Sequence, residues 1–266
     1  DTCGIMRPVT KHSYLVKDVK DLARIVKEAF YIASTGRKGP VLIDFPVDVS
    51  RAKTEFSYPK SVNIRGYKPT VEGHPKQIGR AAEILSGAKR PVLYVGGGCI
   101  ASGAAAELTE FARKTGIPVT TTVHGLGAFP EDDPLSLRML GMHGTHYANY
   151  AVQNSDVLVA VGARFDDRVT GKVDLFAPKA RIIHIDIDPS SISKTIPVHC
   201  PIVGDVKHIL KELTKQVGKL SIPEWIDQIN EWKKKHPLKY ETTGKTVRQQ
   251  YVIDKIGQLT NHDAVV

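Results

Sequence analysis

A short segment in the second half of the chain concentrates acidic and basic side chains. Residues 162–171 (GARFDDRVTG) contain Arg164, Asp166, Asp167 and Arg168, and the preceding residues DVLVAVG are typical of a buried strand. Such a segment can be an ordinary solvated loop whose charges pair with one another. It can also be a binding site, because guanidinium groups bind anionic oxygens and carboxylates accept hydrogen bonds.

Glycines and carboxylates also follow other short apolar runs. They form the segments 96–98 (GGG), 121–127 (TTVHGLG), 186–188 (DID) and 204–206 (GDV). In a doubly wound sheet, ligands bind outside the carboxyl ends of the strands. Glycine lets a ligand approach the backbone, and a helix that begins there offers its N–H groups to a phosphate. We therefore expect a nucleotide-like ligand at this edge.

The glycine cluster does not indicate an ordinary NAD dehydrogenase. YVGGGCI is not the complete dinucleotide fingerprint, and about 20 residues further on the next strand ends in Thr121 and Thr122 instead of an acidic residue. Asp186 and Asp188 are alternative acceptors for ribose hydroxyls. They can equally cap the PSSIS turn that follows, and the pattern leaves both interpretations open.

Other catalytic chemistry lacks a sequence signature. His124, His143 and His146 have no spacing typical of a metal site, and the pair Asp166–Asp167 is more typical of a solvated or arginine-paired couple than of a magnesium site. The sequence contains neither a P-loop nor a G-x-S-x-G motif. We therefore predict no metal site among these residues, and no nucleophile or phosphate-loop signature is present in the sequence.

Predicted strands and helices alternate between residues 73 and 217. Apolar runs predict strands at 91–95, 117–122, 156–162, 181–188 and 201–204. Periodic apolar positions predict helices at 74–88, 102–116, 145–155 and 205–216. Short apolar strands separated by helices predict an α/β fold, a doubly wound parallel sheet covered on both faces.

Partial elements flank this domain. Residues 1–50 contain one predicted helix (19–34) and one strand (41–45), which are too few to bury a core. Residues 51–72 have few apolar clusters and two prolines, so we interpret them as a linker. Residues 218–266 contain two amphipathic helices, at 222–237 and 246–260, and a strand that begins within 262–266. We expect the chain, which begins without Met, to be a piece of a longer protein.

Composition argues against several classes of protein. With 41% hydrophobic and 24% charged residues the chain is typical of globular proteins, and no apolar run of about 18 residues predicts a membrane span. The net charge of +9 is dispersed and accompanies no nucleic-acid motif, so we expect no nucleic-acid partner. Cys3, Cys99 and Cys200 are too far apart and unpatterned for a disulfide framework.

Several longer motifs together resemble one family. The segments TGRKGPVLIDFPVDVS, PVLYVGGGCI, MLGMHGTHYANYAV and GARFDDRVTG are similar to those of the catalytic large subunit of acetohydroxyacid synthase, also called acetolactate synthase. The resemblance covers nearly the whole chain. It implies an enzyme that uses thiamine diphosphate and Mg²⁺ to decarboxylate pyruvate. The two-carbon unit is joined to pyruvate or 2-oxobutyrate, in branched-chain amino-acid biosynthesis.

The resemblance also implies a domain assignment. Residues 1–50 would be the C-terminal tail of the pyrimidine-binding domain, 51–72 a linker, 73–217 the central FAD-binding domain, and 218–266 a linker with the start of the diphosphate-binding domain. The sequence lacks the thiamine-activating glutamate and the Gly-Asp-Gly motif, so the chain alone would be inactive. The resemblance implies a homodimer or tetramer with a small regulatory subunit, located in a prokaryotic cytoplasm or a eukaryotic organelle.

The family's FAD is largely structural, and its contacts carry over onto matching positions of this chain. The implied contacts are Arg37, Gly96, Gly97, Gly98, Thr122, Val123, Leu137, Arg138, Met139, Leu140, Gly141, Met142, His143, Gly162, Ala163, Arg164, Phe165, Asp166, Arg168, Asp186, Ile187, Asp205 and Val206. Met139, Asp167 and Arg168 also resemble residues of the substrate and inhibitor channel.

Two positions depart from the family pattern. Val47 replaces the usual lysine at the channel mouth, and His124 replaces Met, Leu or Gln beside the isoalloxazine ring, so inhibitor and ring contacts are expected to differ there. Two other interpretations stay open. One is another thiamine-dependent carboligase, of the glyoxylate carboligase type, and the other is a non-catalytic nucleotide-binding module.

Overall fold

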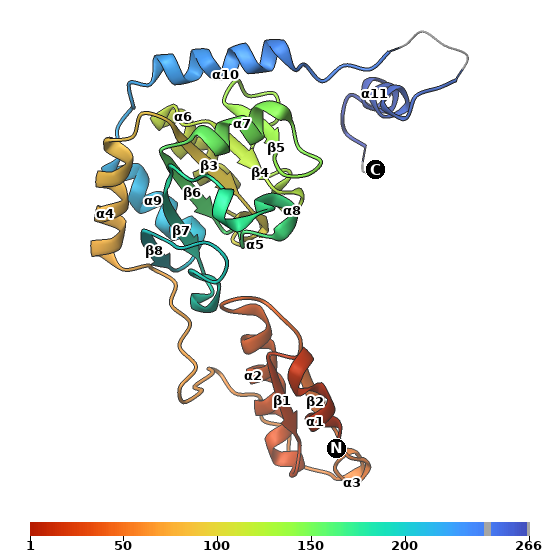
Figure 1. Ribbon diagram of the computed structural model, residues 1–266. Helices are drawn as coiled ribbons and strands as arrows, with labels where there is room; N and C mark the ends of the chain where they lie inside the picture. Colours follow the sequence, from red (N-terminus) through yellow and green to blue (C-terminus); the bar gives the residue numbers. More distant parts are fainter. Residues whose placement is uncertain (242–245, 265–266) are drawn as a thin grey trace.

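A parallel sheet forms the centre of the molecule in the computed structural model, which describes residues 1–241 and 246–264 (Figure 1). Its six strands within that range are β3 (Pro91–Val95), β4 (Val119–Thr121), β5 (Ser136–Met139), β6 (Val157–Val161), β7 (Arg181–Asp186) and β8 (Cys200–Val203). They lie in the order β5-β4-β3-β6-β7-β8, and each neighbouring pair is parallel. The predicted doubly wound α/β fold is confirmed.

The strand order reverses between β3 and β6. The chain runs outward from β3 to β5, returns to the centre, and runs outward again from β6 to β8. Val95 pairs with Val161 at the carboxyl ends of the two central strands, and both strands are buried along their whole length. In open α/β sheets the crevice beyond such a reversal is where ligands bind. The topology therefore predicts that a ligand binds next to the segments that follow Val95 and Val161.

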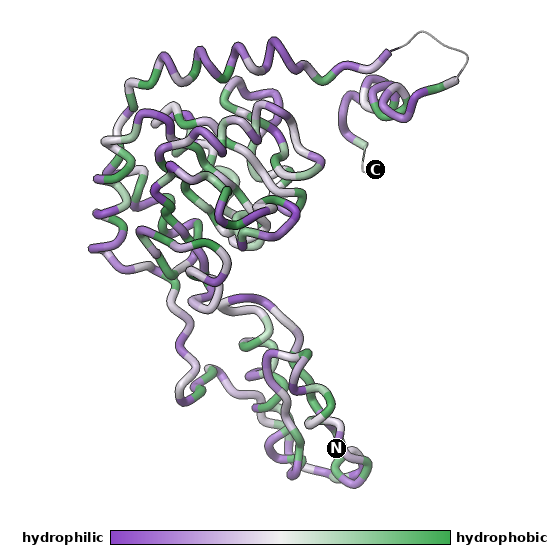
Figure 2. Tube along the Cα trace, viewed as in Figure 1, coloured by the Kyte–Doolittle hydropathy of each residue, from purple (hydrophilic) through white to green (hydrophobic). Residues whose placement is uncertain are grey.

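Helices cover both faces of the sheet. α4 (Pro75–Ser86), α6 (Ala105–Thr115) and α9 (Val206–Gln216) share one hydrophobic core with Leu93 and Val95 of β3. α7 (His146–Asn154) and α10 (Pro223–Lys235) share a second core with Val92 and Tyr94. Successive side chains of a strand point to opposite faces, so β3 supplies the two cores alternately. Figure 2 shows that hydrophobic residues gather in the sheet, whereas α10 is largely hydrophilic.

Residues 1–51 form a smaller unit next to the central sheet (Figure 1). β1 (His12–Leu15) pairs in parallel with β2 (Val41–Asp44), and α2 (Leu22–Ser34) packs beside them. The short helices α1 (Thr2–Met6) and α3 (Val47–Arg51) complete the unit. Its hydrophobic core cluster is formed by the buried residues Val16, Ile25 and Val49, and α2 also buries Ala29 and Ile32. This core is small, as expected for one helix with little sheet to pack against.

The remaining segments connect or extend these two units. Residues 52–74, all of them described, contain neither helix nor strand. They include the predicted linker, although the domain boundaries themselves stay predictions. α5 (Gly97–Ala101) and α8 (Asp167–Thr170) follow β3 and β6, and α11 (Gln249–Leu259) lies near the end of the chain. The predicted final strand falls partly on residues 265 and 266, outside the described residues.

The described residues contain no helix that is both long and apolar enough to cross a membrane. The thiols of Cys3, Cys99 and Cys200 are free, and Cys99 and Cys200 are buried.

Candidate functional site

A cavity of about 1210 Å³ opens at the carboxyl edge of the central sheet, beyond the strand reversal. Pockets for drug-sized ligands typically measure about 300–1,000 Å³, so this cavity can hold a larger ligand. Its walls come from the segments after β3, β4, β6 and β7, from the loop between α2 and β2, and from residues 67–71. Segments that are distant in the sequence therefore meet around one space.

Most of the predicted FAD contacts line this cavity. They are Arg37, Gly96, Gly97, Gly98, Thr122, Val123, Met139, Leu140, Met142, His143, Gly162, Ala163, Arg164, Asp166, Arg168, Asp186, Ile187, Asp205 and Val206. Of the predicted channel residues, Met139 and Arg168 line it as well. The fold thus brings these residues together, while their contact with FAD stays a prediction.

Five predicted residues lie away from the cavity lining. Leu137 is fully buried in the core shared with α7, and Arg138 pairs with Glu131 at 3.3 Å. Gly141 (φ +94°) sits in a turn where an added Cβ would lie 2.7 Å from the carbonyl oxygen of Arg168. The remaining two are Phe165, which is buried, and Asp167, whose side chain is 83% exposed.

The glycines after β3 and β6 allow two turns to touch. The N–H of Gly96 donates to Val161 O at 2.9 Å, and the N–H of Gly98 donates to Gly162 O at 3.0 Å. A Cβ on Gly98 would lie 2.7 Å from Gly162 Cα, and Gly162 itself has φ +59°. These glycines therefore permit close packing of the two turns at the strand reversal, in addition to lining the cavity.

Phe165 anchors residues 162–171, the charged loop that follows β6. It is 2% exposed, and its ring centroid lies 5.5 Å from that of Tyr94, 6.0 Å from that of Phe176 and 5.1 Å from that of His184. Its φ of +55° is in the left-handed region, which residues other than glycine seldom adopt. The buried ring therefore holds the backbone in a turn that leaves the flanking charged side chains at the surface.

Arg164, Asp166 and Arg168 form the charged wall of the cavity. Arg164 Nη2 lies 3.5 Å from Asp166 Oδ2, and Asp166 caps α8 by accepting a hydrogen bond from the N–H of Arg168 at 3.2 Å. This backbone hydrogen bond is the main cause that lowers the pKa of Asp166, and the nearby guanidinium groups lower it further. The wall therefore combines an ionised carboxylate with two cations.

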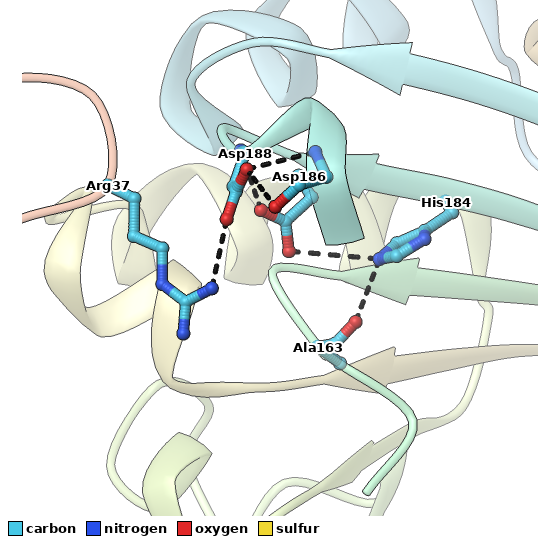
Figure 3. Close-up of polar contacts among 6 residues, drawn as sticks. Arg37, Ala163, His184, Asp186 and Asp188 are labelled. Carbon is cyan, nitrogen blue, oxygen red and sulfur yellow. Dashed lines mark hydrogen bonds and ion pairs between the residues drawn. The ribbon is translucent and has the colours of Figure 1, made fainter. Parts of the chain in front are cut away.

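Asp186 and Asp188 belong to a polar network at the end of β7 (Figure 3). Arg37 Nη1 lies 2.9 Å from Asp188 Oδ2, and Asp186 Oδ1 accepts a hydrogen bond from the N–H of Asp188 at 2.8 Å. His184 Nε2 lies 2.8 Å from Ala163 O and 3.7 Å from Asp186 Oδ2. The network connects the α2–β2 loop, the end of β7 and the charged loop.

The two aspartates differ in what their carboxylates do. Asp188 caps the turn at Pro189–Ser191, accepting hydrogen bonds from the N–H (2.9 Å) and the hydroxyl (2.7 Å) of Ser190. Burial acts to raise the pKa of Asp188, but hydrogen bonds from Ser190 and Arg37 outweigh it and hold that pKa below its usual value. Asp186 instead lines the cavity. Capping thus accounts for Asp188, whereas Asp186 lines the cavity and its contact with a ligand stays a prediction.

Asp188→Asn is expected to cost about 0.5 kcal/mol of unfolding free energy near neutral pH, because it removes the ion pair with Arg37 but keeps a capping oxygen. The folded-state pKa of Asp188 is depressed, so its contribution is present above the unfolded aspartate pKa of about 4 and is lost as the pH falls through the folded-state value. Denaturant unfolding of both proteins, near neutral pH and in acid, measures this difference. An equal loss in an Arg37→Gln background would contradict the ion pair as its source.

Asp205 closes the cavity beside the first residue of α9. Its Oδ1 accepts hydrogen bonds from the Ser102 hydroxyl at 2.8 Å and from the N–H of Lys207 at 3.0 Å. Asp205 is thereby the N-cap of α9, and Val206 next to it also lines the cavity. Asp205 therefore both caps the N-terminus of α9 and lines the cavity.

One wall of the cavity was not predicted from the sequence, and its residues belong to the predicted linker and to α2. Tyr67, Lys68 and Pro69 line the cavity, as does Tyr31. The Tyr67 hydroxyl accepts a hydrogen bond from Lys11 Nζ at 2.9 Å, and its ring meets that of Tyr31 edge-on at 5.9 Å between centroids. A tyrosine close to a proline was the available signal, although Tyr58 and Pro59 in the same linker show a similar pattern and do not line the cavity.

The three histidines considered for metal binding do not come together. His124 and His143 line the cavity, whereas His146 on α7 stacks against His236, with 4.6 Å between ring centroids. Across residues 1–241 and 246–264, no group of three or more His, Cys, Asp or Glu residues could hold a metal ion.

Comparison with known proteins agrees with this architecture. The family model described as "Thiamine pyrophosphate enzyme, central domain" matches residues 78–213, which contain the six-stranded sheet, α6, α7 and most of α4 and α9. The fold and the cavity are those of a doubly wound α/β domain that binds a ligand at its strand reversal. The chain belongs to the thiamine pyrophosphate enzyme family.

Curated relatives extend the similarity beyond the central domain. The chain is 47% identical to an acetolactate synthase large subunit of Buchnera aphidicola subsp. Schizaphis graminum, over 98% of the chain and 47% of that protein. It is 44% identical to the isozyme 3 large subunit of Escherichia coli, over 100% of the chain and 48% of that protein. It is 46% identical to acetolactate synthase 1, chloroplastic, of Zea mays, over 98% of the chain and 42% of that protein.

These relatives confirm the resemblance to acetolactate synthase large subunits that the motifs indicate. The chain spans about half the length of the curated relatives it matches.

Proposed function

We propose that the chain is part of an acetolactate synthase large subunit and that its cavity binds FAD. The observation that carries the proposal is that residues assigned to FAD by resemblance, from Arg37 to Val206, line one cavity at the strand reversal. The identity of 44–47% to the curated relatives supports the same assignment. The resemblance and the position of the cavity are independent, because the topology alone predicts a ligand there.

The chemistry of the lining fits FAD. Arg37, Arg164 and Arg168 provide guanidinium groups, which pair with diphosphate oxygens in bidentate geometry. Carboxylates such as those of Asp186 and Asp205 accept hydrogen bonds from ribose hydroxyls. FAD would fill the space between the α2–β2 loop and the central sheet, and it would perform no net redox chemistry. Arg37 would exchange part of its contact with Asp188 for the cofactor.

Thiamine diphosphate and Mg²⁺ would supply the carbanion chemistry of the whole enzyme. We propose that the whole enzyme decarboxylates pyruvate and joins the two-carbon unit to pyruvate or 2-oxobutyrate. We also propose a homodimer or tetramer with a small regulatory subunit, in a prokaryotic cytoplasm or a eukaryotic organelle. The residues of this chain would hold FAD and form part of the substrate channel at Met139 and Arg168.

The test is acetolactate formation from pyruvate by the full-length subunit supplied with thiamine diphosphate, Mg²⁺ and FAD. We expect activity in the full-length subunit and none in the 266-residue chain alone, since its sequence lacks the Gly-Asp-Gly motif. Carboligation of glyoxylate in place of pyruvate would indicate a glyoxylate carboligase. Nucleotide binding without any turnover would indicate a non-catalytic module.

A further inference from the structure

Tyr94 combines complete burial with a position at the cavity. Four buried side-chain polar atoms in residues 1–241 and 246–264 have no hydrogen-bond partner, and of these only the Tyr94 hydroxyl belongs to a residue that lines the cavity. The Tyr94 side chain is 0% exposed. Buried polar groups are nearly always paired, so an unpaired hydroxyl beside a ligand space requires an explanation.

The position of Tyr94 in the sheet explains why a fully buried residue also lines the cavity. Tyr94 lies on β3, two residues before Gly96, where the strand reversal opens the crevice. Its register neighbours are Thr120 on β4 and Ala160 on β6, both small, which leaves room for a large ring between them. The ring packs against Phe165, below the charged loop. The side chain is therefore held rigidly by its strand and by the aromatic cluster.

The hydroxyl of Tyr94 is a hydrogen-bond donor without an acceptor. Burial is the main cause that raises its pKa far above the usual tyrosine value, so the phenol stays protonated. The backbone N–H of Phe165 acts to lower this pKa, but an N–H can only donate to the hydroxyl oxygen and leaves the hydroxyl proton unpaired. An acceptor on a bound ligand would complete this group.

We propose that the Tyr94 hydroxyl donates a hydrogen bond to an oxygen of FAD where the ligand crosses the strand reversal, so that Tyr94 is a cofactor-binding residue. The inference rests on the proposed function, since it takes FAD as the ligand. FAD carries diphosphate, ribityl and ribose oxygens, each of which accepts hydrogen bonds. Tyr94 would contact FAD from the central strand β3, whereas the arginines would contact it from segments outside the sheet.

The test compares wild type and Tyr94→Phe in the full-length subunit. FAD affinity is measured by flavin fluorescence titration and the melting temperature is measured without FAD. We expect the Kd for FAD to rise about tenfold, because one hydrogen bond to the ligand is lost. The melting temperature of the FAD-free protein should stay the same or rise, because the substitution removes an unpaired buried polar atom and keeps the ring.

The two readouts separate a binding role from a structural one. A Kd change smaller than about twofold would overturn the inference, as would a clear fall in the melting temperature of the FAD-free variant. The matched control is Tyr14→Phe, because the Tyr14 hydroxyl donates to Glu28 at 3.0 Å, away from the cavity. This control should lower the melting temperature and leave the Kd unchanged. Absence of FAD binding by the wild type would contradict the proposed function, and the inference with it.

Discussion

Gly162→Ala is expected to destabilise the protein by about 3 kcal/mol, lowering Tm by on the order of 10 °C, and to abolish flavin retention. An added Cβ would lie 2.6 Å from Gly98 Cα and 2.9 Å from Cys99 N, and these backbone atoms cannot move without parting the turns after β3 and β6. The left-handed φ of +59° adds about 1–2 kcal/mol for any residue with a Cβ. The measurements are thermal unfolding and the flavin content of the purified protein.

The matched control for this prediction is Gly103→Ala. Gly103 has a similar φ, +63°, but an added Cβ would meet nothing within 4 Å. It should therefore lose only the conformational part, about 1 kcal/mol, and keep its flavin. Equal destabilisation of the two variants would contradict the claim that close packing of the turns decides the effect at position 162.

Phe165→Ala is expected to cost about 3–5 kcal/mol of unfolding free energy, the range for removing a buried aromatic ring. The ring fills the space between Tyr94, Phe176 and His184, and without it the charged loop loses its anchor. We expect the Kd for FAD to rise more than about tenfold, since Arg164 and Asp166 would no longer be held at the cavity wall. Denaturant unfolding and fluorescence titration measure the two effects.

Phe165→Gly tests how much the left-handed backbone conformation at position 165 contributes to the loss of stability. It removes the same ring but relieves the left-handed strain at φ +55°, so it should be more stable than Phe165→Ala by about 1 kcal/mol. Phe176→Ala is the control for the aromatic cluster, because Phe176 contacts Phe165 but does not line the cavity. It should lower stability and keep the flavin. Flavin loss in that variant, or a glycine variant less stable than the alanine variant, would count against the account.

The buried strands could be predicted from the sequence because their apolar runs are continuous. β3 and β6 are buried on both faces, and each run ends in glycine. β1 and β5 were missed. The sequences HSYL and SLRM contain no apolar run, since β1 belongs to a two-stranded sheet and β5 is an edge strand that is buried only at Ser136 and Leu137. Their pairing comes from tertiary contacts that local periodicity does not encode.

Most of the predicted part of the candidate site follows strand ends, and Arg37 in the α2–β2 loop was assigned by resemblance alone. Resemblance and topology both point to the residues after β3, β6 and β7, and those segments line the cavity. The wall from Tyr67 to Val71 could not be inferred, because its place depends on Lys11 and Tyr31 in another unit. The resemblance assigns Asp166 to FAD and Asp167 to the substrate channel, and of these two aspartates only Asp166 lines the cavity.

Whether the cavity at the strand reversal binds FAD is measured by the flavin absorption of the purified full-length subunit, followed by FAD titration of the flavin-free protein. We expect a bound flavin spectrum that is restored by added FAD in the wild type and in Gly103→Ala, and that is lost in Gly162→Ala. A colourless wild-type protein that stays colourless after incubation with FAD would contradict this expectation.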